Sequence, residues 1–323
     1  MTECIWHAVT TMNGLTDPAD AQTVDAPATG QGTAVALGVF DGVHLGHQAL
    51  LAALVDRARQ RDLPVVAVTY FPHPMSIVSP GAAPPALASL DRRIELLKAA
   101  GADRVEVTPF DTELSTLSPE DYVRRELVGR LSARIVAVGD NFRFGHRASG
   151  DVTTLAELGE RYGFEVVTIP VGSGASARSS SRVRECLARG DVRGAQDILG
   201  RRYAVTGSVV HGEHRGRELG YPTANVEVET GTCLPGDGVY AGWLSWIGQR
   251  LPAAISVGTN PHFDGQRRTV EAYVLDRDDL DLYDLSVTVE FADRIRSQAR
   301  FDSLGDLLAT MARDVEQARV ITG

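Results

Sequence analysis

Hydrophobic and polar residues follow two different patterns along the chain, and the change falls near Gly200. Before it, short β-branched runs at residues 34–40, 64–71 and 134–138 alternate with segments of helical periodicity. This alternation is typical of a parallel sheet with helices on both faces. Residues 1–199 are therefore predicted to form an α/β domain of Rossmann type, with ligands beyond the carboxyl ends of its strands. Its other expected elements are an entry strand and loop at 1–32, helices at 91–100, 153–162 and 182–199, strands at 103–107 and 164–169, a helix start at Ser118 and a proline-rich loop at 72–85.

After Gly200, short alternating strands separated by Gly and Pro turns dominate, which predicts an antiparallel β-barrel in residues 200–323. The end of the chain returns to helical periodicity, with an apolar stripe on one face. Core packing is the more common role of such a stripe, and partner binding is the alternative. The predicted strands are 203–210, 226–228, 238–246, 250–257, 269–275 and 286–294, and the stripe consists of Leu304, Leu307, Leu308, Met311, Val315 and Ala318.

The stretch at residues 38–51, GVFDGVHLGHQALL, joins a predicted strand to a predicted helix through a glycine turn. The first turn of a helix has unpartnered N–H groups and the positive end of the helix dipole, so it favours anions. His44 and His47 add side-chain donors at the same place. No lysine follows, so this is not the GxxxxGK phosphate loop. We interpret the stretch as an anion-binding turn; a structural or surface histidine pair is the alternative.

Composition limits the classes of partner. The chain has 323 residues, which is long enough for two domains with real cores. It is 43% hydrophobic and carries a formal net charge of −10. Broad binding to nucleic acid or to anionic membranes is disfavoured because it needs a basic surface. Nucleotide substrates remain compatible, since local cations, helix ends and Mg²⁺ hold phosphates within acidic proteins.

The three cysteines are far apart and odd in number, which indicates reduced thiols. Neither a signal peptide nor an apolar run of about 20 residues is evident. We therefore expect a cytoplasmic protein without a membrane segment. A homo-oligomer is compatible with the sequence but is not specified by it.

Eight motifs together resemble the bifunctional prokaryotic riboflavin kinase/FAD synthetase family, and HxGH alone resembles the nucleotidylyltransferase signature. The likeness covers nearly the whole chain after residue 34. It departs at Ser181 and Val183, where the family commonly has threonine and isoleucine, and both replacements keep the chemistry. In chain order the motifs are GVFDGVHLGH (38–47), FPHP (71–74), GDNFRFG (139–145), SSSRVR (179–184), GRELGYPTAN (216–225), GVY (238–240), VGTNPHF (257–263) and VEAYVLD (270–276).

For the first domain, the resemblance implies a nucleotidylyltransferase-like fold and the reaction of FMN with ATP to FAD and pyrophosphate. The FMN phosphate is already an anion, so catalysis is positioning and charge stabilisation. For Arg182 and Arg184, a position on a solvated helix face is the alternative to a role at the site. The implied catalytic residues are His44, His47, Asn141, Ser180, Ser181 and Arg184, and the implied substrate-binding residues are Gly38, Phe40, Asp41, Gly42, Phe71 and Arg182.

For the second domain, the resemblance implies a riboflavin kinase barrel in which Glu271 is the general base on the ribityl hydroxyl. In an alternating strand Glu271 shares a face with Thr269 and Tyr273, and a solvent-facing glutamate is the alternative. Thr223 and Asn225 also point the same way, and their neutral oxygens suit Mg²⁺ bound with ATP.

Gly212, Gly216 and Gly220 precede Thr223 and Asn225, and residues without a side chain would let the backbone approach the phosphates. A zinc site at His211 and His214 is disfavoured because neither a cysteine nor a third histidine is near. The implied substrate-binding residues of this domain are Gly216, Gly220 and Pro222, next to Gly212.

These features predict a cytoplasmic enzyme with two active sites, whose partners are ATP, riboflavin, FMN and FAD. Two alternatives stay open from the sequence. Either only one module is active, or the chain is a flavin-nucleotide-binding or regulatory protein without turnover. A turnover assay with riboflavin, ATP and Mg²⁺ discriminates among these alternatives.

Overall fold

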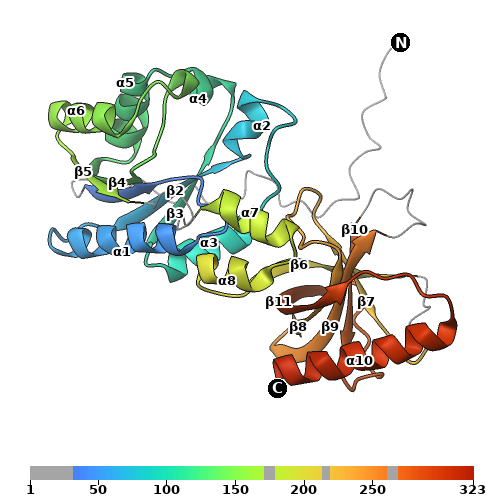
Figure 1. Ribbon diagram of the computed structural model, residues 1–323. Coiled ribbons are helices and arrows are strands. Elements are labelled where there is room, and N and C mark those ends of the chain that lie inside the picture. Colours follow the sequence, from blue (N-terminus) through green and yellow to red (C-terminus); the bar gives the residue numbers. More distant parts are fainter. Residues whose placement is uncertain (1–31, 171–178, 213–218, 260–267) are drawn as a thin grey trace, which may run out of the picture.

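The chain forms a parallel-sheet domain followed by a closed antiparallel barrel and a C-terminal helix, as the sequence pattern predicts (Figure 1). The computed structural model describes residues 32–170, 179–212, 219–259 and 268–323. The entry strand expected before Gly32 therefore lies outside the described residues. No helix in the described part of the chain is long and apolar enough to span a membrane.

The first domain is built on a five-stranded sheet in the order β3-β2-β1-β4-β5, with every neighbouring pair parallel. The chain adds β2 and β3 on one side of β1 and then β4 and β5 on the other side. The strand order therefore reverses between β1 and β4, which is where ligands bind in open α/β sheets. The strands are β1 (Thr33–Leu37), β2 (Val65–Phe71), β3 (Arg104–Pro109), β4 (Ala133–Gly139) and β5 (Glu165–Ile169).

Two hydrophobic cores cover the two faces of this sheet. Because side chains alternate along β1, Ala34 and Ala36 face the core beneath α1 and α3, whereas Val35 and Leu37 face the core beneath η2 and α6. Figure 1 shows α1 and α6 on opposite sides of the sheet. The covering helices are α1 (Leu45–Arg59), α3 (Leu90–Ala99), α5 (Pro119–Tyr122), the π-helix η2 (Val123–Arg130) and α6 (Val152–Tyr162).

Two expectations about helices in this half were wrong. The predicted loop at 72–85 contains α2 (Pro74–Val78), because Pro74 is tolerated in the first turn and His73 caps it. The predicted single helix at 182–199 is two helices, α7 (Ser180–Ala188) and α8 (Val192–Leu199). Gly190 is left-handed, and Asp191 then caps α8. The remaining short elements are α4 (Thr112–Thr116) and η3 (His146–Ala148).

The second domain is a closed barrel in the order β10-β7-β6-β11-β8-β9. All of its strand pairs are antiparallel, and the inward residues of its strands form one core, which includes Val209, Val226 and Val270. The strands are β6 (Tyr203–Val210), β7 (Ala224–Val228), β8 (Gly238–Trp246), β9 (Gln249–Thr259), β10 (Arg268–Val274) and β11 (Ser286–Ser297).

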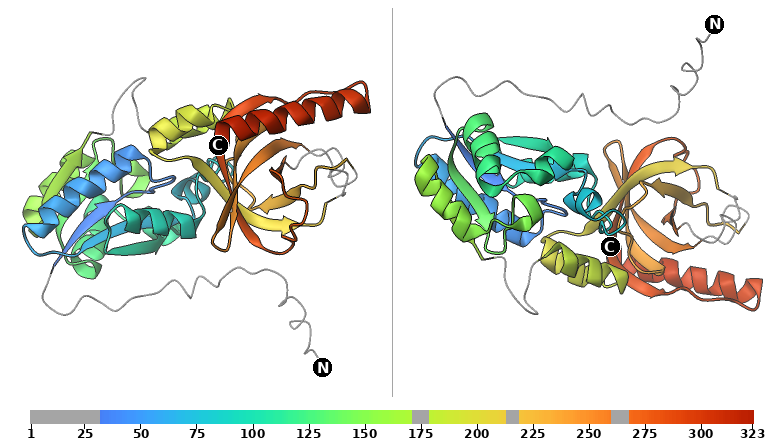
Figure 2. Two further views of the ribbon diagram at one scale, coloured as in Figure 1. Left: turned by 90° about the horizontal axis from the view of Figure 1, so that it is seen from below. Right: turned by 90° about the horizontal axis from the view of Figure 1, so that it is seen from above.

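The C-terminal helix α10 (Leu304–Thr322) lies along the outside of the barrel (Figures 1 and 2). The predicted core packing of its apolar stripe holds only toward its end, where Ala318 is fully buried beside Ala241 and Leu275. At its start Leu304 is 59% exposed, because the helix begins beyond the strands that it covers.

The two halves share packing at the junction. Figure 2 shows α7 and α8 between the sheet domain and the barrel in both views. Val183 and Leu187 of α7 and Leu199 of α8 belong to the same hydrophobic cluster as the barrel interior. Backbone bonds add to this contact, since Ala86 donates to the carbonyl of Gly231 at 2.7 Å.

Candidate functional site

The polar residues of the first predicted site lie at the carboxyl edge of the sheet, beside the reversal of strand order. His44 follows β1 and begins α1, while Asn141 follows the neighbouring strand β4 and is exposed. Because parallel strands end at the same edge, the turn that carries His44 and the turn that carries Asn141 lie at one edge of the sheet, where ligands bind in such folds.

His44 is the N-cap of α1. Its Nδ1 accepts hydrogen bonds from the N–H groups of Gly46 (3.1 Å) and His47 (3.4 Å). The expectation that the first-turn N–H groups are unpartnered is therefore wrong for these two, because the imidazole already satisfies them. An Nδ1 that accepts leaves the proton of the neutral ring on Nε2, so His44 can still donate from that atom.

Burial keeps both histidines neutral at pH 7. It lowers the pKa of His44 to about 4, with a further contribution from the positive charge of Arg201. It also lowers the pKa of His47 well below the usual 6.5, with His44 and Arg93 adding to the effect. The two rings stack at 3.6 Å, and Phe40 packs edge-on against His47. The pair therefore offers N–H donors rather than fixed cations.

The turn between β1 and His44 has an unusual backbone. Phe40, Gly42 and Val43 all have positive φ, at 53°, 79° and 38°. Gly38 lies against the ring of Phe40, since a Cβ there would be 3.1 Å from the ring carbons. This conformation is rare for residues with a side chain, so the surrounding contacts must hold it in place.

Asp41 lies at the centre of a buried charge cluster. It is 2% exposed, it accepts the N–H of Leu87 at 3.0 Å, and it pairs with Arg184 and, at 3.8 Å, with Arg93. The hydroxyl of Ser180 donates to the backbone carbonyl of Asp41 at 2.7 Å. Three predicted site residues, Asp41, Ser180 and Arg184, are thus brought together, largely by bonding to one another.

The other predicted residues of this half are more open to solvent. Ser181 is exposed in the first turn of α7, and Arg182 forms a surface ion pair with Glu185 at 2.8 Å, which fits the solvated-face alternative for this arginine. Phe71, at the end of β2, is 46% exposed. An exposed aromatic ring at this edge is available to a planar ligand.

The predicted kinase residues meet on two neighbouring strands of the barrel. Glu271 of β10 lies directly opposite Asn225 of β7 in the strand register. Residues paired in this way have Cβ atoms about 4.5–5.5 Å apart on one face. Thr223 lies just before β7, two residues from Asn225. Tyr273 is next on the face of Glu271, and its ring packs against Tyr221 at 5.3 Å.

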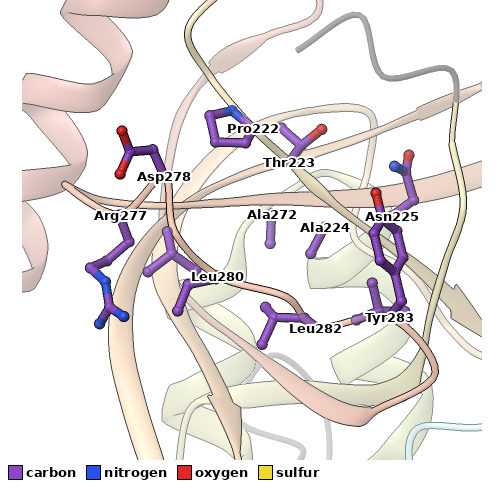
Figure 3. Close-up of a pocket in the computed structure, with 12 residues that line it drawn as sticks. Pro222, Thr223, Ala224, Asn225, Ala272, Arg277, Asp278, Leu280, Leu282 and Tyr283 are labelled. Atoms are coloured by element: carbon purple, nitrogen blue, oxygen red, sulfur yellow. The ribbon is translucent and has the colours of Figure 1, made fainter. Parts of the chain in front are cut away.

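Thr223 and Asn225 also border a cavity of about 60 Å³ (Figure 3). Glu271 is not among the residues that line this cavity, whereas its neighbour Ala272, on the opposite face of β10, is. Side chains from β6, from β7 and the residues just before it, and from β10 and the segment after it form the lining, which is partly apolar. Its other members include Pro222, Ala224, Ala272, Val274, Asp278, Leu282 and Tyr283.

The glycines near this cavity have different surroundings. A Cβ on Gly212 would be 2.2 Å from the amide nitrogen of Asn225, so Gly212 lies directly against this side chain. Gly220 has φ 82° in open space. Gly216 and His214 lie outside the described residues. His211 stacks on Tyr283 at 4.0 Å, and the described chain contains no group of three or more His, Cys, Asp or Glu side chains placed to hold a metal.

Three charged or titratable groups near the first site were not predicted from the sequence. Arg93 is 4% exposed in α3, His73 caps α2, and the pKa of His73 is lowered by burial and influenced by Asp41. Arg201 follows α8 and donates to the HxGH turn. His73 belongs to the FPHP motif and could have been singled out, whereas nothing in the local sequence marks either arginine.

Two family models cover most of the chain, one in each half. The model for FAD synthetase matches residues 26–183, and the model for riboflavin kinase matches residues 199–322. Their order is the order of the two folds.

Relatives align over nearly their full length. The bifunctional riboflavin kinase/FMN adenylyltransferase of Escherichia coli K12 is 36% identical over 91% of this chain and 94% of its own. That of Pseudomonas fluorescens is 36% identical over 90% and 93%. A crystal structure titled as a macrolide-efflux protein from Streptococcus pneumoniae is 30% identical with a TM-score of 0.81, and the match covers 90% of this chain and 95% of that one.

Proposed function

The chain belongs to the family of bifunctional riboflavin kinases/FMN adenylyltransferases, and we infer from this that it makes flavin nucleotides in two steps. The barrel phosphorylates riboflavin with ATP to FMN, and the sheet domain adenylylates FMN to FAD with release of pyrophosphate. The observation that carries this conclusion is the match of each half to a different family model. We set the functional boundary at residues 199/200, because the barrel strands begin at Tyr203.

For adenylyl transfer, we assign His44 and His47 as donors to the phosphates of ATP. A phosphate oxygen of FMN attacks the α-phosphorus, the bond to the β-phosphate oxygen breaks, and pyrophosphate leaves. The neutral state of both rings and the capping bond of His44 support this assignment, because they direct the Nε2–H of His44 away from the helix. Such a preorganised donor stabilises charge where it shifts between the phosphates.

The remaining assignments in the sheet domain rest on the shared edge. Asn141 and Ser181 are exposed there, so they are accessible to substrate. Arg184 and Ser180 lie next to the turn, and their bonds to Asp41 favour a role in fixing it. Phe71 is assigned to the flavin ring, and Gly38, Phe40, Gly42 and Arg182 to the surroundings of the nucleotide.

For the kinase step, we assign Glu271 as the base that takes the proton of the ribityl hydroxyl. The hydroxyl oxygen attacks the γ-phosphorus of ATP, and ADP leaves. The register of Glu271 with Asn225 supports this role, because it sets the carboxylate beside the predicted phosphate ligands. Gly220 and Pro222 adjoin the same segment, and Gly216 is assigned with them from the motif.

Mg²⁺ with ATP fits the residues present. The hydroxyl of Thr223 and the amide oxygen of Asn225 are neutral oxygen ligands on one strand face, which suits a metal that keeps several waters. Bound there, Mg²⁺ would neutralise phosphate charge. Thr223 and Asn225 would hold it, and Gly212 lies against the Asn225 amide.

We also propose a cytoplasmic location, since the substrates are intracellular nucleotides and the cysteine pattern favours reduced thiols. Cys186 and Cys233 are buried free thiols, in keeping with this. The state of association, whether monomer or homo-oligomer, stays a prediction for sedimentation to test.

The experiment that tests the function is a turnover assay on the full chain. The protein is incubated with riboflavin, ATP and Mg²⁺, and the flavins are separated by chromatography. We expect FMN to appear first and FAD after it, with FAD also formed when FMN is supplied directly. FMN without FAD would leave only the kinase, FAD from FMN alone would leave only the adenylyltransferase, and neither product would leave a binding protein.

A further inference from the structure

We propose that Arg201, a residue of the kinase half, is a positioning residue for adenylyl transfer in the sheet domain. This inference rests on the proposed function. It adds that the FAD-forming site is completed by the junction between the domains, at the point where the second family match begins.

The guanidinium of Arg201 reaches back to the turn that precedes His44. Its Nη2 donates to the carbonyl of Gly42 at 2.7 Å, and its Nη1 donates to the carbonyl of Val43 at 3.1 Å. Nη1 also lies 3.4 Å from the carbonyl of Leu199. One planar side chain thus joins the two successive carbonyls before His44 to the end of α8, which a single ammonium group cannot do with the same geometry.

The two carbonyls that Arg201 holds belong to the residues with positive φ. Val43 has φ 38° and is 1% exposed, and this conformation is an outlier for a β-branched residue. Such a backbone persists only where its surroundings fix it. The peptide that follows carries His44, so any relaxation of Val43 moves the imidazole and its Nε2–H.

Other contacts of the junction meet the same helix start. The side-chain amide of Gln48 in α1 donates to the carbonyls of both Val43 and Leu199 at 3.0 Å. Gly200 is left-handed, and a Cβ there would be 2.5 Å from a methyl carbon of Leu45. Residues 199–201 are therefore packed against the start of α1 rather than forming a free linker.

Arg201 also affects the protonation of the site. It is partly buried, and its positive charge adds to the desolvation that lowers the pKa of His44. The same side chain thus favours the neutral imidazole and holds the turn that carries it.

The neighbouring Arg202 provides a matched control. Its guanidinium carbon lies 4.2 Å from the centre of the Trp243 ring on the barrel, so it shares the position in the chain but not the contact with the turn. We compare Arg201→Met, Arg201→Lys and Arg202→Met in the full chain. The measurements are kcat and KM for FAD formation from FMN, the rate of FMN formation from riboflavin, and thermal unfolding.

We expect Arg201→Met to lower kcat for FAD formation on the order of tenfold to 100-fold, because a misplaced catalytic group costs that much. KM for ATP and the rate of FMN formation should be little changed, Arg201→Lys should be intermediate, and Arg202→Met should match the wild type. The inference is overturned if folded Arg201→Met forms FAD at the wild-type kcat. It is also overturned if the Arg201 and Arg202 variants lower both activities alike.

If Arg201→Met does not fold, Arg201→Lys decides, since it keeps the charge and loses the bridge between carbonyls; a wild-type kcat in that variant would refute the role. The proposed function fails in a different way. A wild-type chain that forms FMN but no FAD would remove the reaction that Arg201 is proposed to support, before any variant is made.

Discussion

His44 uses its two ring nitrogens for different purposes. Its Nδ1 completes the first turn of α1 by accepting two backbone N–H groups, and this bond leaves the proton on Nε2. Mutation to alanine therefore removes a helix cap and a proposed catalytic donor together. The two effects can be separated, because asparagine is also a good N-cap residue.

We predict that His44→Ala lowers the stability of the sheet domain by about 1 kcal/mol through the lost cap. It should also lower FAD formation on the order of 10²–10³-fold through the lost donor. His44→Asn should recover most of the stability and little of the activity, and both variants should still form FMN. Chemical denaturation and the flavin assay measure these effects; recovery of FAD formation by asparagine would show that the cap alone matters.

The protonation of His44 gives a second prediction at this scale. Its folded pKa is about 4 against 6.5 for the free side chain, so the unfolded chain binds a proton between these values that the folded chain does not. The stability from this residue is therefore complete above pH 6.5 and is lost as the pH falls toward 4. We expect NMR of ¹⁵N-labelled histidine to show a neutral His44 ring at about pH 5.5, well below the usual midpoint. A native titration midpoint near 6.5 would contradict this environment.

Glu271 allows the complementary test. We expect Glu271→Gln to lower FMN formation on the order of 10²–10⁴-fold, the usual contribution of a general base, while FAD formation from supplied FMN continues. Glu290→Gln is the control, because Glu290 lies on β11, which is not adjacent to β10 in the barrel, and its carboxylate pairs with Arg250 of β9. Equal losses in both variants would point to damage to the barrel rather than to a base.

At the scale of elements, two helices end at left-handed glycines, and one of these glycines also packs against α1. Gly163 ends α6 and Gly200 ends α8, and both are left-handed, with φ 81° and 71°. A Cβ on Gly163 would meet nothing within 4 Å, whereas one on Gly200 would meet Leu45 at 2.5 Å. The two positions therefore share a backbone requirement and differ only in packing.

We predict that Gly163→Ala costs about 1–2 kcal/mol, the general cost of a left-handed residue with a Cβ. Gly200→Ala should cost more and should also reduce FAD formation, because it displaces the start of α1. Thermal unfolding together with the flavin assay compares the two variants. Equal destabilisation, with FAD formation intact in both, would mean that the junction does not press on α1.

At the scale of the whole molecule, the packing of α7 and α8 does not follow the order of the chain. Both helices precede the barrel in sequence, yet their buried residues belong to the hydrophobic cluster of the barrel interior. Arg184 of α7 meanwhile pairs with Asp41 of the sheet domain. The two helices therefore connect the proposed adenylylation site to the core of the other domain.

We predict that the amides of α7 and α8 exchange hydrogen together with those of β6 and β8, because residues that share a core open in one cooperative unit. The amides of α6, whose buried residues belong to a core of the sheet domain, serve as the comparison. Hydrogen exchange measured by mass spectrometry distinguishes the two groups once the domains differ in stability. Exchange of α7 with α6, ahead of the barrel, would contradict shared packing.

Local pattern in the sequence determined most of the elements of this fold. Strands such as β6 and β8 were predicted with their observed bounds, because an alternating apolar run between turn residues has few other conformations. The break between α7 and α8 was not predicted, although the sequence indicates it: Gly190 is a typical residue after a helix end, and Asp191 is a typical N-cap. The short helix α2 was not predicted, because the prolines of this segment indicated a loop, although proline is tolerated in the first turn of a helix.

The sequence by itself determined the two fold classes, the family resemblance and the motif residues, since all of these are encoded by neighbours along the chain. Only the tertiary structure decided which partners those residues have. It brought Arg93 and Arg184 to the carboxylate of Asp41, Arg201 to the carbonyls of the HxGH turn, and Glu271 opposite Asn225. The physical reason is that burial and hydrogen bonding join residues distant in sequence, and these contacts set where each group lies and what it bonds to.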